Sequence, residues 1–156
     1  MDSLTIEKAG HRDIESIKKL EADSGLSPWT KDDYLQEINA NNEFFLVVKK
    51  NQKLIGFLLA RLIMNDSSSF IISEIEIYNI AVNKNYRREK IASRLIENLI
   101  EKAGIYNVNK VYLEVRESNL NAQELYLNRL FKITGKRKNF YTNPCENAIL
   151  MCRELS

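Results

Sequence analysis

The fold is decided by a strand-to-helix junction that reads Glu74-Ile75-Glu76-Ile77-Tyr78-Asn79-Ile80-Ala81-Val82, followed by Asn83-Lys84-Asn85. The chain from Phe70 to Val82 is rich in isoleucine and alternates with period two at Glu74–Ile77, which predicts a long central strand. After the junction, one helical face collects the apolar side chains of Ile91, Leu95, Ile96, Leu99 and Ile100. We expect this helix to stop at Gly104.

The same alternation of strand and helix continues toward the C-terminus. Residues 111–115 predict a compact strand, and Ser118 or Asn119 can cap a helix that carries Ala122, Leu125 and Tyr126. A strand beginning at Phe131 and a last one through residues 148–151 complete the order. Strands that alternate with helices indicate right-handed crossovers onto a partly parallel sheet.

The first half has a different pattern. Apolar positions at helical spacing between Ile14 and Leu20, and a capped start at Thr30, predict two helices in the first forty residues. The apolar runs 44–48 and 54–60 flank a polar segment and predict an antiparallel hairpin, and we expect a loop at Asn65 to Ser69. The predicted fold is a mixed α/β sheet flanked by helices, in one domain spanning residues 1–156.

Composition excludes several classes of protein. A chain of 156 residues with 44% hydrophobic residues, 28% charged residues, 5 Gly and 2 Pro is neither disordered nor fibrous. The apolar run from Leu54 to Ile63 is too short for a membrane span, and it contains Arg61. The N-terminus lacks the basic segment and apolar core of a secretion signal, so we expect a cytoplasmic protein with no membrane partner.

Metal and nucleic-acid chemistry are also disfavoured. One histidine, His11, and two cysteines, Cys145 and Cys152, do not provide a zinc cluster, so we expect no metal, reduced thiols and no role for His11. A net charge of +2 is too small to indicate a nucleic-acid binder. The cations nevertheless form two groups: Lys84, Arg87, Arg88, Lys90 and Arg94, and Arg129, Lys132, Lys136, Arg137 and Lys138. Each group either meets phosphate or is solvated surface.

The first group of cations lies where the helix after Val82 begins. The start of a helix offers unpaired N–H groups and a positive dipole end, and a fixed cation there costs ~0.3 to 1 kcal/mol. An anion such as pyrophosphate would offset that cost, and a solvated cluster is the alternative. No glycine occurs between Gly56 and Gly104, so Walker and GxGxxG loops are absent from the junction. This excludes P-loop enzymes, kinases and nicotinamide dehydrogenases.

Four segments resemble the GNAT N-acetyltransferase family, and most closely its RimI-type members: Pro28-Trp29, Tyr78-Asn79-Ile80-Ala81-Val82, Leu113-Glu114-Val115-Arg116-Glu117-Ser118-Asn119 and Lys138-Asn139-Phe140-Tyr141. The third segment is the most specific. The resemblance implies an acetyl-CoA-dependent enzyme that acetylates the N-terminal alanine of the eighteenth small-subunit ribosomal protein, with no direct contact to nucleic acid.

The resemblance also implies a set of cofactor-binding residues. The backbone of Ile80, Ala81 and Val82 matches the strand end that pairs with the pantetheine arm of acetyl-CoA. The family's pyrophosphate loop matches Arg87, Arg88, Glu89, Lys90, Ile91, Ala92 and Ser93. Lys90 replaces the loop's central glycine, whose missing Cβ lets backbone approach a phosphate, although lysine can add a point charge. Asn119 resembles a CoA contact, and it is equally explained as a helix cap.

Two further residues match the family's catalytic positions. Glu114 matches the proton acceptor that deprotonates the substrate ammonium, and Tyr126 matches the general acid that protonates the departing thiolate. On the residues alone, Glu114 could be a solvent-facing strand residue and Tyr126 a core aromatic; Glu74 and Glu76 are rival carboxylates. Leu130 replaces a family glycine, and we expect the helix end beside it to be rearranged.

The sequence allows several kinds of acetyl acceptor, and it also allows a protein without catalytic activity. By resemblance, Trp29 and Tyr141 are candidates for peptide contact, and each could equally be core. Direct transfer needs no covalent intermediate, so Cys145 is not required as a nucleophile. The alternatives are a GNAT enzyme acting on a small amine or a lysine, and a non-catalytic module that binds CoA or nucleic acid.

Overall fold

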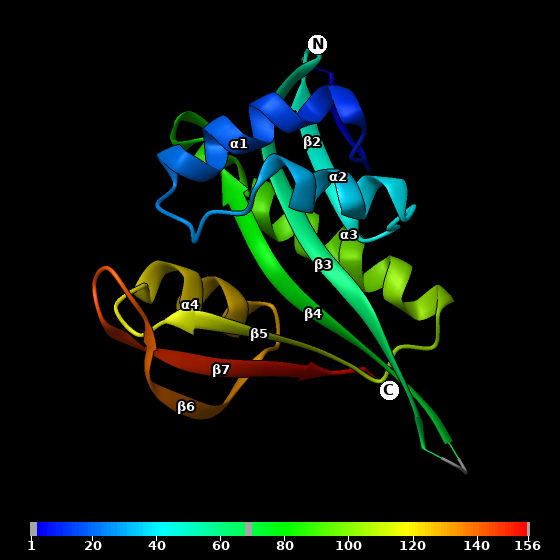
Figure 1. Ribbon diagram of the computed structural model, residues 1–156, viewed down its shortest axis with the longest axis vertical. Coiled ribbons are helices and arrows are strands. Elements are labelled where there is room, and N and C mark those ends of the chain that lie inside the picture. The colour runs from blue at the N-terminus through cyan, green and yellow to red at the C-terminus, as the bar shows by residue number, and fades with distance from the viewer. Residues whose placement is uncertain (1–2, 68–69, 156) are drawn as a thin grey trace. The chain divides into compact units, whose positions relative to one another are not determined.

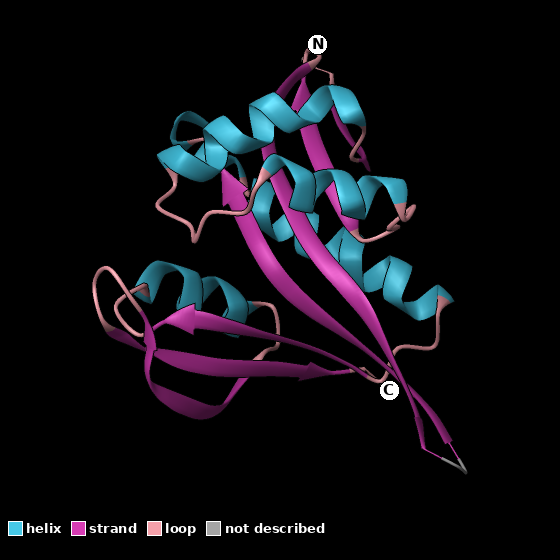
Figure 2. Ribbon diagram, viewed as in Figure 1, coloured by secondary structure: helices cyan, strands magenta, loops and turns pink. Residues whose placement is uncertain are grey.

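The computed structural model describes residues 3–67 and 70–155 (Figure 1). It contains a mixed sheet of seven strands in the order β1-β2-β3-β4-β5-β7-β6. The strands are β1 (Leu4–Lys8), β2 (Phe45–Lys50), β3 (Lys53–Ser67), β4 (Phe70–Val82), β5 (Lys110–Arg116), β6 (Lys132–Tyr141) and β7 (Glu146–Glu154). The α-helices are α1 (Ile14–Asp23), α2 (Lys31–Asn39), α3 (Ile91–Ile105) and α4 (Leu120–Asn128), and the 3₁₀ helices are η1 (His11–Asp13) and η2 (Lys84–Glu89). The predicted mixed α/β class is confirmed (Figure 2).

The chain forms two compact units. Unit 1 contains the residues up to Arg61 together with Asn79–Lys102, and unit 2 contains Leu62–Tyr78 together with the residues from Ala103 onward. Strands β3 and β4 and helix α3 each contribute residues to both units. The expectation of a single domain stays a prediction.

In unit 1, the strands are covered by α1 and α2 on one face and by α3 on the other (Figure 1). The predicted hairpin is confirmed, since β2 pairs antiparallel with β3. The predicted capped start at Thr30 is confirmed as well, because the Thr30 hydroxyl accepts from the Asp33 N–H and the Asp33 carboxylate accepts from the Thr30 N–H. Strand β1 pairs antiparallel with β2 and was not predicted, because it is only five residues long.

Tyr34 of α2 belongs to unit 1 and is fully buried. Its ring packs against Trp29, Phe45 and Phe57, with ring centroids 5.6, 5.7 and 6.2 Å away. Its hydroxyl donates to the carboxylate of buried Glu21, which also accepts from the Trp29 N–H at 3.1 Å. These contacts tie the segment between α1 and α2 to the core.

In unit 2, the part of β4 from Glu74 to Ile77 pairs parallel with Lys110–Leu113 of β5. This confirms the predicted parallel pairing for the crossover through α3. Strand β7 pairs antiparallel with both β5 and β6, so it separates these two strands within the sheet.

Two predicted boundaries are wrong. The loop expected at Asn65 to Ser69 is in part strand, since β3 continues to Ser67; residues 68 and 69 lie outside the described part of the chain. Strand pairing uses backbone groups that every residue type carries, so polar side chains did not end the strand. Helix α3 also runs through Gly104 to Ile105, because the left-handed residue that follows it is Asn107, with φ 53°.

The C-terminus of α4 is regular, so the rearrangement expected from Leu130 is wrong. Leu130 has φ 69°, its N–H donates to the Leu127 carbonyl at 3.1 Å, and the Phe131 N–H donates to the Tyr126 carbonyl at 3.0 Å. This is a Schellman motif with leucine in the left-handed position where glycine is usual. The Tyr126 and Phe131 rings, 5.6 Å apart, add the apolar contact that accompanies the motif.

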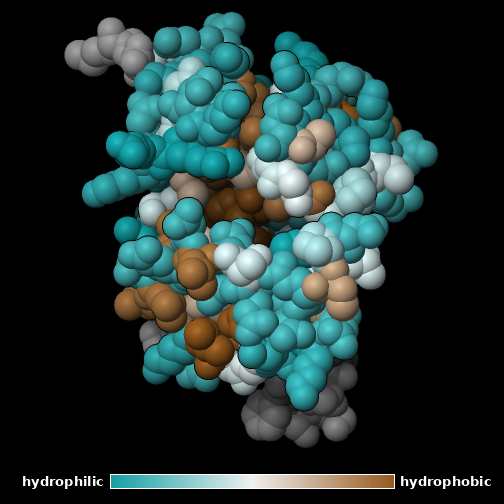
Figure 3. Space-filling view, turned by 90° about the vertical axis from the view of Figure 1, so that its left-hand side faces the viewer, coloured by the Kyte–Doolittle hydropathy of each residue, from teal (hydrophilic) through white to brown (hydrophobic). Residues whose placement is uncertain are grey.

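Several apolar side chains of unit 2 are exposed. Figure 3 views the side on which α4 lies in Figure 1, and apolar groups reach the surface there. The exposed residues of α4 and its C-terminal end include Leu120, Leu127 and Leu130, with exposed fractions of 70%, 48% and 69%. The left-handed Leu130 therefore gains little from burial.

Candidate active site

The turn between β4 and α3 lies in unit 1 and carries the predicted diphosphate-binding residues. Asn83 begins the turn, and its side-chain oxygen accepts from the Asn85 N–H at 3.0 Å. Helix η2 follows, and Lys90 then takes a left-handed conformation, φ 58° and ψ 30°, directly before α3 begins at Ile91. The sequence therefore placed the cations correctly at the start of α3.

The charges of this turn are not balanced within the described chain. The Glu89 carboxylate lies 2.9 Å from the Lys50 ammonium and forms an ion pair with it. Among the described residues, Arg87, Arg88 and Lys90 form no ion pair with a carboxylate, and all three are exposed. The first N–H groups of a helix also lack partners within the helix. The turn thus presents positive charge and N–H donors together, which suits a diphosphate.

Lys90 has a left-handed φ, a conformation in which glycine is usual. A residue with a Cβ is strained in this conformation, and glycine is not. The Lys90 side chain is exposed, so its ammonium is available to an anion. The remaining predicted loop residues enter α3: Ile91 is buried, and Ala92 and Ser93 are half-buried.

Ile80, Ala81 and Val82 form the end of β4, within unit 1. The parallel ladder between β4 and β5 covers Glu74–Ile77 and does not include these three residues. A Cβ on Gly56 of β3 would lie 3.1 Å from the Ala81 carbonyl oxygen and 2.8 Å from Val48 Cγ1, so Gly56 permits the close approach of β3 at this point.

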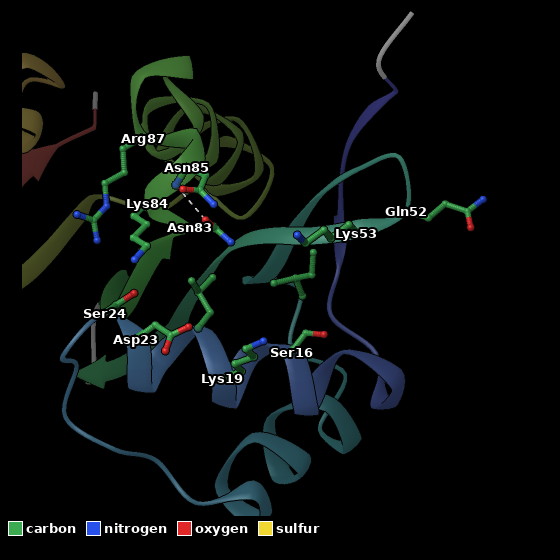
Figure 4. A pocket seen from close by; sticks show the side chains of 12 residues that line it. Ser16, Lys19, Asp23, Ser24, Gln52, Lys53, Asn83, Lys84, Asn85 and Arg87 are labelled. Atoms are coloured by element: carbon green, nitrogen blue, oxygen red, sulfur yellow. Dashed lines mark hydrogen bonds between the residues drawn. The ribbon is translucent and has the colours of Figure 1, made fainter.

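Unit 1 also contains a cavity of about 550 Å³ that the sequence did not reveal (Figure 4). Its lining comes from α1, the tip of the β2–β3 hairpin and η2, and includes Lys84 and Arg87. In Figure 4, Lys84 extends from η2 toward Ser24 and Asp23. Three segments far apart in the sequence form this cavity, and no single motif marks it.

Glu114 lies on the polar face of β5 in unit 2. Val111, Leu113 and Val115 are buried and Glu114 is intermediate, so the predicted alternation is confirmed. The Glu114 side chain is 17% exposed, and Oε1 lies 3.3 Å from Arg137 Nε. Burial raises the pKa of Glu114 above its ordinary value, Arg137 opposes this rise, and Glu76 adds to it.

The rival carboxylates are on β4 in the same unit. Glu74 lies 3.3 Å from the Lys110 ammonium, so it has a cationic partner. Glu76 is opposite Tyr112 in the β4–β5 ladder. Burial, followed by the charges of Glu76 and Glu74, raises the pKa of Tyr112 to about 12. The charge of Glu76 also contributes to the raised pKa of Glu114.

Tyr126 is buried in unit 2, with 4% of its surface exposed. Burial, with a smaller contribution from Tyr141, raises the pKa of its phenol well above the ordinary value. The hydroxyl therefore stays protonated through the neutral range and can act as a hydrogen-bond donor. The Tyr126 ring also packs on Phe131, as expected for an aromatic residue of the core.

Tyr141 and the residues after Glu114 form one corner of unit 2. Arg116 lies 4.4 Å from the centroid of the Tyr141 ring and 3.2 Å from the Glu146 carboxylate. Burial and then the Glu114 charge raise the pKa of Tyr141, so these two side chains interact. Asn119 caps α4 by accepting from the Ala122 N–H at 3.1 Å, which confirms its structural role.

Trp29, the other candidate for acceptor contact, lies in unit 1 and is half-buried. Its ring stacks on Tyr34 and lies 5.4 Å from the Arg61 guanidinium. Part of the ring therefore belongs to the core of unit 1. No cluster of three or more His, Cys, Asp or Glu side chains that could hold a metal occurs among residues 3–67 and 70–155.

Comparisons with known proteins show the family of this chain. The family model of the acetyltransferase (GNAT) family matches residues 14–130, and the chain belongs to this family. It is 34% identical over 140 residues to a Bacillus subtilis (strain 168) protein that carries, provisionally, the name ribosomal protein bS18-alanine N-acetyltransferase; the match covers 89% of this chain and 87% of the relative.

Two solved structures extend the comparison. The crystal structure of the ribosomal-protein-S18-alanine N-acetyltransferase from Escherichia coli is similar with a TM-score of 0.78 and 26% identity, covering 99% of this chain and 95% of that one. Arabidopsis thaliana NAA60 in complex with acetyl-CoA has a TM-score of 0.86 and 20% identity, covering 98% and 100% of the two chains, and shows the shared fold.

Proposed function

We propose that this chain transfers the acetyl group of acetyl-CoA to the N-terminal alanine of a small-subunit ribosomal protein, and that it does so in the cytoplasm. Its family and the names of its relatives support this function. The observation that carries the chemistry is the Glu114 carboxylate, which is partly withdrawn from water and has a raised pKa. Among the described residues, no helix is long and apolar enough to cross a membrane.

The turn between β4 and α3 has the role of holding the donor. Arg87, Arg88 and Lys90 supply charge to its diphosphate, and the backbone from Glu89 to Ser93 supplies N–H donors. The backbone of Ile80, Ala81 and Val82 hydrogen-bonds the pantetheine arm as an added strand does. Asn119 keeps its capping role and adds a contact to CoA.

Glu114 has the role of general base. The acceptor arrives as an ammonium ion, and Glu114 takes one proton from it so that a neutral amine remains. The amine nitrogen then forms a bond to the acetyl carbonyl carbon, the bond from that carbon to sulfur breaks, and the nitrogen loses its second proton. A raised pKa makes Glu114 a better base than an ordinary carboxylate.

Tyr126 has the role of assisting the leaving group. The sulfur departs as a thiolate and needs one proton, and the phenol, which is protonated at neutral pH, can hydrogen-bond the sulfur and supply that proton. Overall, the ammonium loses two protons, one reaches the thiol, and one is released to solvent. Tyr141 contacts the acceptor peptide, and Glu76 and Glu74 of the same unit favour the positive end of the peptide by charge.

Acetylation of synthetic peptides tests the function. The protein is incubated with acetyl-CoA and an alanine-initiated peptide, and the products are followed by mass spectrometry. The same peptide with a blocked amino end, a peptide with an internal lysine, and a small polyamine serve as competing acceptors. We expect acetylation at the free alanine terminus. Acetylation of only the lysine or the polyamine would show that the enzyme acts on that class of acceptor instead. No acetylation of any acceptor would contradict the proposed function.

A further inference from the structure

The pair formed by Glu114 and Arg137 is unequal in its exposure to solvent. Arg137 comes from β6 and reaches across β7, because β7 lies between β5 and β6 in the sheet. The Glu114 side chain is 17% exposed, whereas that of Arg137 is 56% exposed. Arg137 is the solvent-exposed member of the pair, so water can hydrate its guanidinium when it leaves Glu114.

Arg137 is the one cation that the described residues place in an ion pair with Glu114. The other charged or titratable groups around this carboxylate are Glu76 on β4, Tyr141 at the end of β6, and Tyr112 and Arg116 on β5 itself. Of these, Arg116 is already engaged: it contacts the Glu146 carboxylate and the Pro144 carbonyl, each at 3.2 Å.

Arg137 has a second partner of its own. Its guanidinium lies 5.3 Å from the centroid of the Phe140 ring, and Phe140 is 45% exposed. A guanidinium stacked on an aromatic face keeps a favourable contact and remains hydrated at its edge. If Arg137 leaves the carboxylate, it therefore does not become an isolated charge.

We propose that Arg137 is a place-holder for the acceptor: it pairs with Glu114 while no acceptor is bound, and the ammonium group of the incoming N-terminus displaces it. This inference rests on the proposed function, because it takes Glu114 as the base. Arg137 is a positioning residue that acts through Glu114 and does not touch the reacting atoms.

The exchange has a chemical consequence. With Arg137 in place, its positive charge opposes the rise in the pKa of Glu114 that partial burial and the Glu76 charge cause. When an ammonium replaces Arg137, it brings the same charge to the carboxylate together with a proton that it can give up. Once that proton is transferred, the amine is neutral and Glu114 is a neutral acid, so neither side of the pair retains a charge. An acceptor with a blocked amino end carries no cation and cannot displace Arg137.

A titration of the free protein tests the pairing without requiring turnover. The side-chain carbons of ¹³C-labelled glutamate are followed by NMR against pH in wild type, R137Q and K138Q, with E114Q to assign the Glu114 signal. Lys138 is the matched control, because it is the next residue of β6, is exposed, and loses the same charge. We expect the Glu114 midpoint to lie about one pH unit higher in R137Q and to be unchanged in K138Q. Equal midpoints in R137Q and wild type would overturn the pairing.

Steady-state kinetics test the displacement. Removing a place-holder should lower the KM for an alanine-initiated peptide several-fold at a pH where Glu114 is ionised, while kcat is retained. The acidic limb of kcat/KM should move to higher pH, and R137K should restore the wild-type limb in part. A raised KM with an unmoved limb would show that Arg137 holds the acceptor or the fold, and would overturn the proposal.

The two failures are distinguishable. If wild type acetylates no alanine-initiated peptide, the proposed function is wrong, and the NMR titration still reports whether Arg137 controls Glu114. If wild type is active but R137Q and K138Q share its KM and its acidic limb, the function stands and the place-holder is wrong.

Discussion

Glu114 and Tyr126 are both shifted by burial in the direction that their proposed roles need. A carboxylate that leaves water becomes a stronger base, and a phenol that leaves water stays protonated. Partial burial of Glu114 and full burial of Tyr126 produce these two results from one physical cause. The charge of Arg137 opposes the rise in the pKa of Glu114. Because the Arg137 side chain is exposed, the proposed displacement by an acceptor would remove this opposition.

Replacement of Tyr126 by phenylalanine separates chemistry from packing. We expect kcat to fall by about 10²-fold with a nearly unchanged KM for acetyl-CoA, since the ring stays buried against Phe131 and only the hydroxyl is lost. Thermal unfolding should be close to that of wild type. Tyr106→Phe, at a position that is 41% exposed, is the matched control. An unchanged kcat together with lower stability would assign the hydroxyl to the core.

At the scale of elements, one identified residue defines each end of α4. Asn119 caps its start, and Leu130 closes its end in a left-handed conformation. The first end combines a structural and a proposed binding role. The second keeps the geometry that glycine usually provides, although the residue is leucine.

Leu130→Gly should stabilise the protein. A left-handed non-glycine residue costs ~1 to 2 kcal/mol, glycine loses ~0.5 to 1 kcal/mol of chain entropy on folding, and the exposed side chain contributes little. We expect a gain of about 0.5 to 1 kcal/mol in the free energy of unfolding, measured with urea. Leu127→Gly is the control and should instead lose about 1 kcal/mol, because Leu127 lies within the helix. A loss of stability in Leu130→Gly would contradict the assignment.

Two substitutions at Asn119 separate the cap from the CoA contact. Asn119→Ala should lower the free energy of unfolding by about 1 kcal/mol and raise the KM for acetyl-CoA. Asn119→Ser restores a capping oxygen but not the amide, so stability should recover while the raised KM remains. If KM recovers together with stability, Asn119 is a cap and makes no contribution to CoA binding.

The sequence predicted the elements whose signals are local. The limits of β4 follow from its isoleucine-rich run, the start of α2 from the capping box at Thr30, and the cations of the turn from their position before Ile91. The resemblance supplied the proposed roles of Glu114 and Tyr126, whereas their environments depend on tertiary neighbours, Arg137 for Glu114 and Tyr141 for Tyr126. The contact with Arg137 depends on the insertion of β7 between β5 and β6, which no local pattern encodes.

For the whole molecule, the cations of the turn between β4 and α3 should repel one another in the free protein and attract a bound anion. Net charge is only +2, yet Arg87, Arg88 and Lys90 lie together without carboxylate partners among the residues that the structure describes. Like charges close together repel, and a bound anion relieves that repulsion. Ligand binding should therefore stabilise the entire fold.

We expect CoA to raise the midpoint of thermal unfolding. At a free concentration of about 100 times Kd, the stabilisation should be about 2.7 kcal/mol. Arg87→Gln should weaken binding about tenfold and remove about 1.4 kcal/mol of this effect at the same concentration. Arg12→Gln, an exposed cation of η1 outside the turn, should leave it unchanged. An equal response in all three proteins would show that the turn does not hold the diphosphate.

The central claim is that Glu114 removes the proton from the acceptor amine, and the pH dependence of kcat/KM in Glu114→Gln tests it most directly. In wild type, kcat/KM for an alanine-initiated peptide should rise as Glu114 ionises. In Glu114→Gln, it should fall by about 10²- to 10⁴-fold at neutral pH. It should then rise only as the acceptor deprotonates by itself, near the ordinary α-amino pKa of about 8. A variant that keeps the wild-type value of kcat/KM and the wild-type limb would contradict the account.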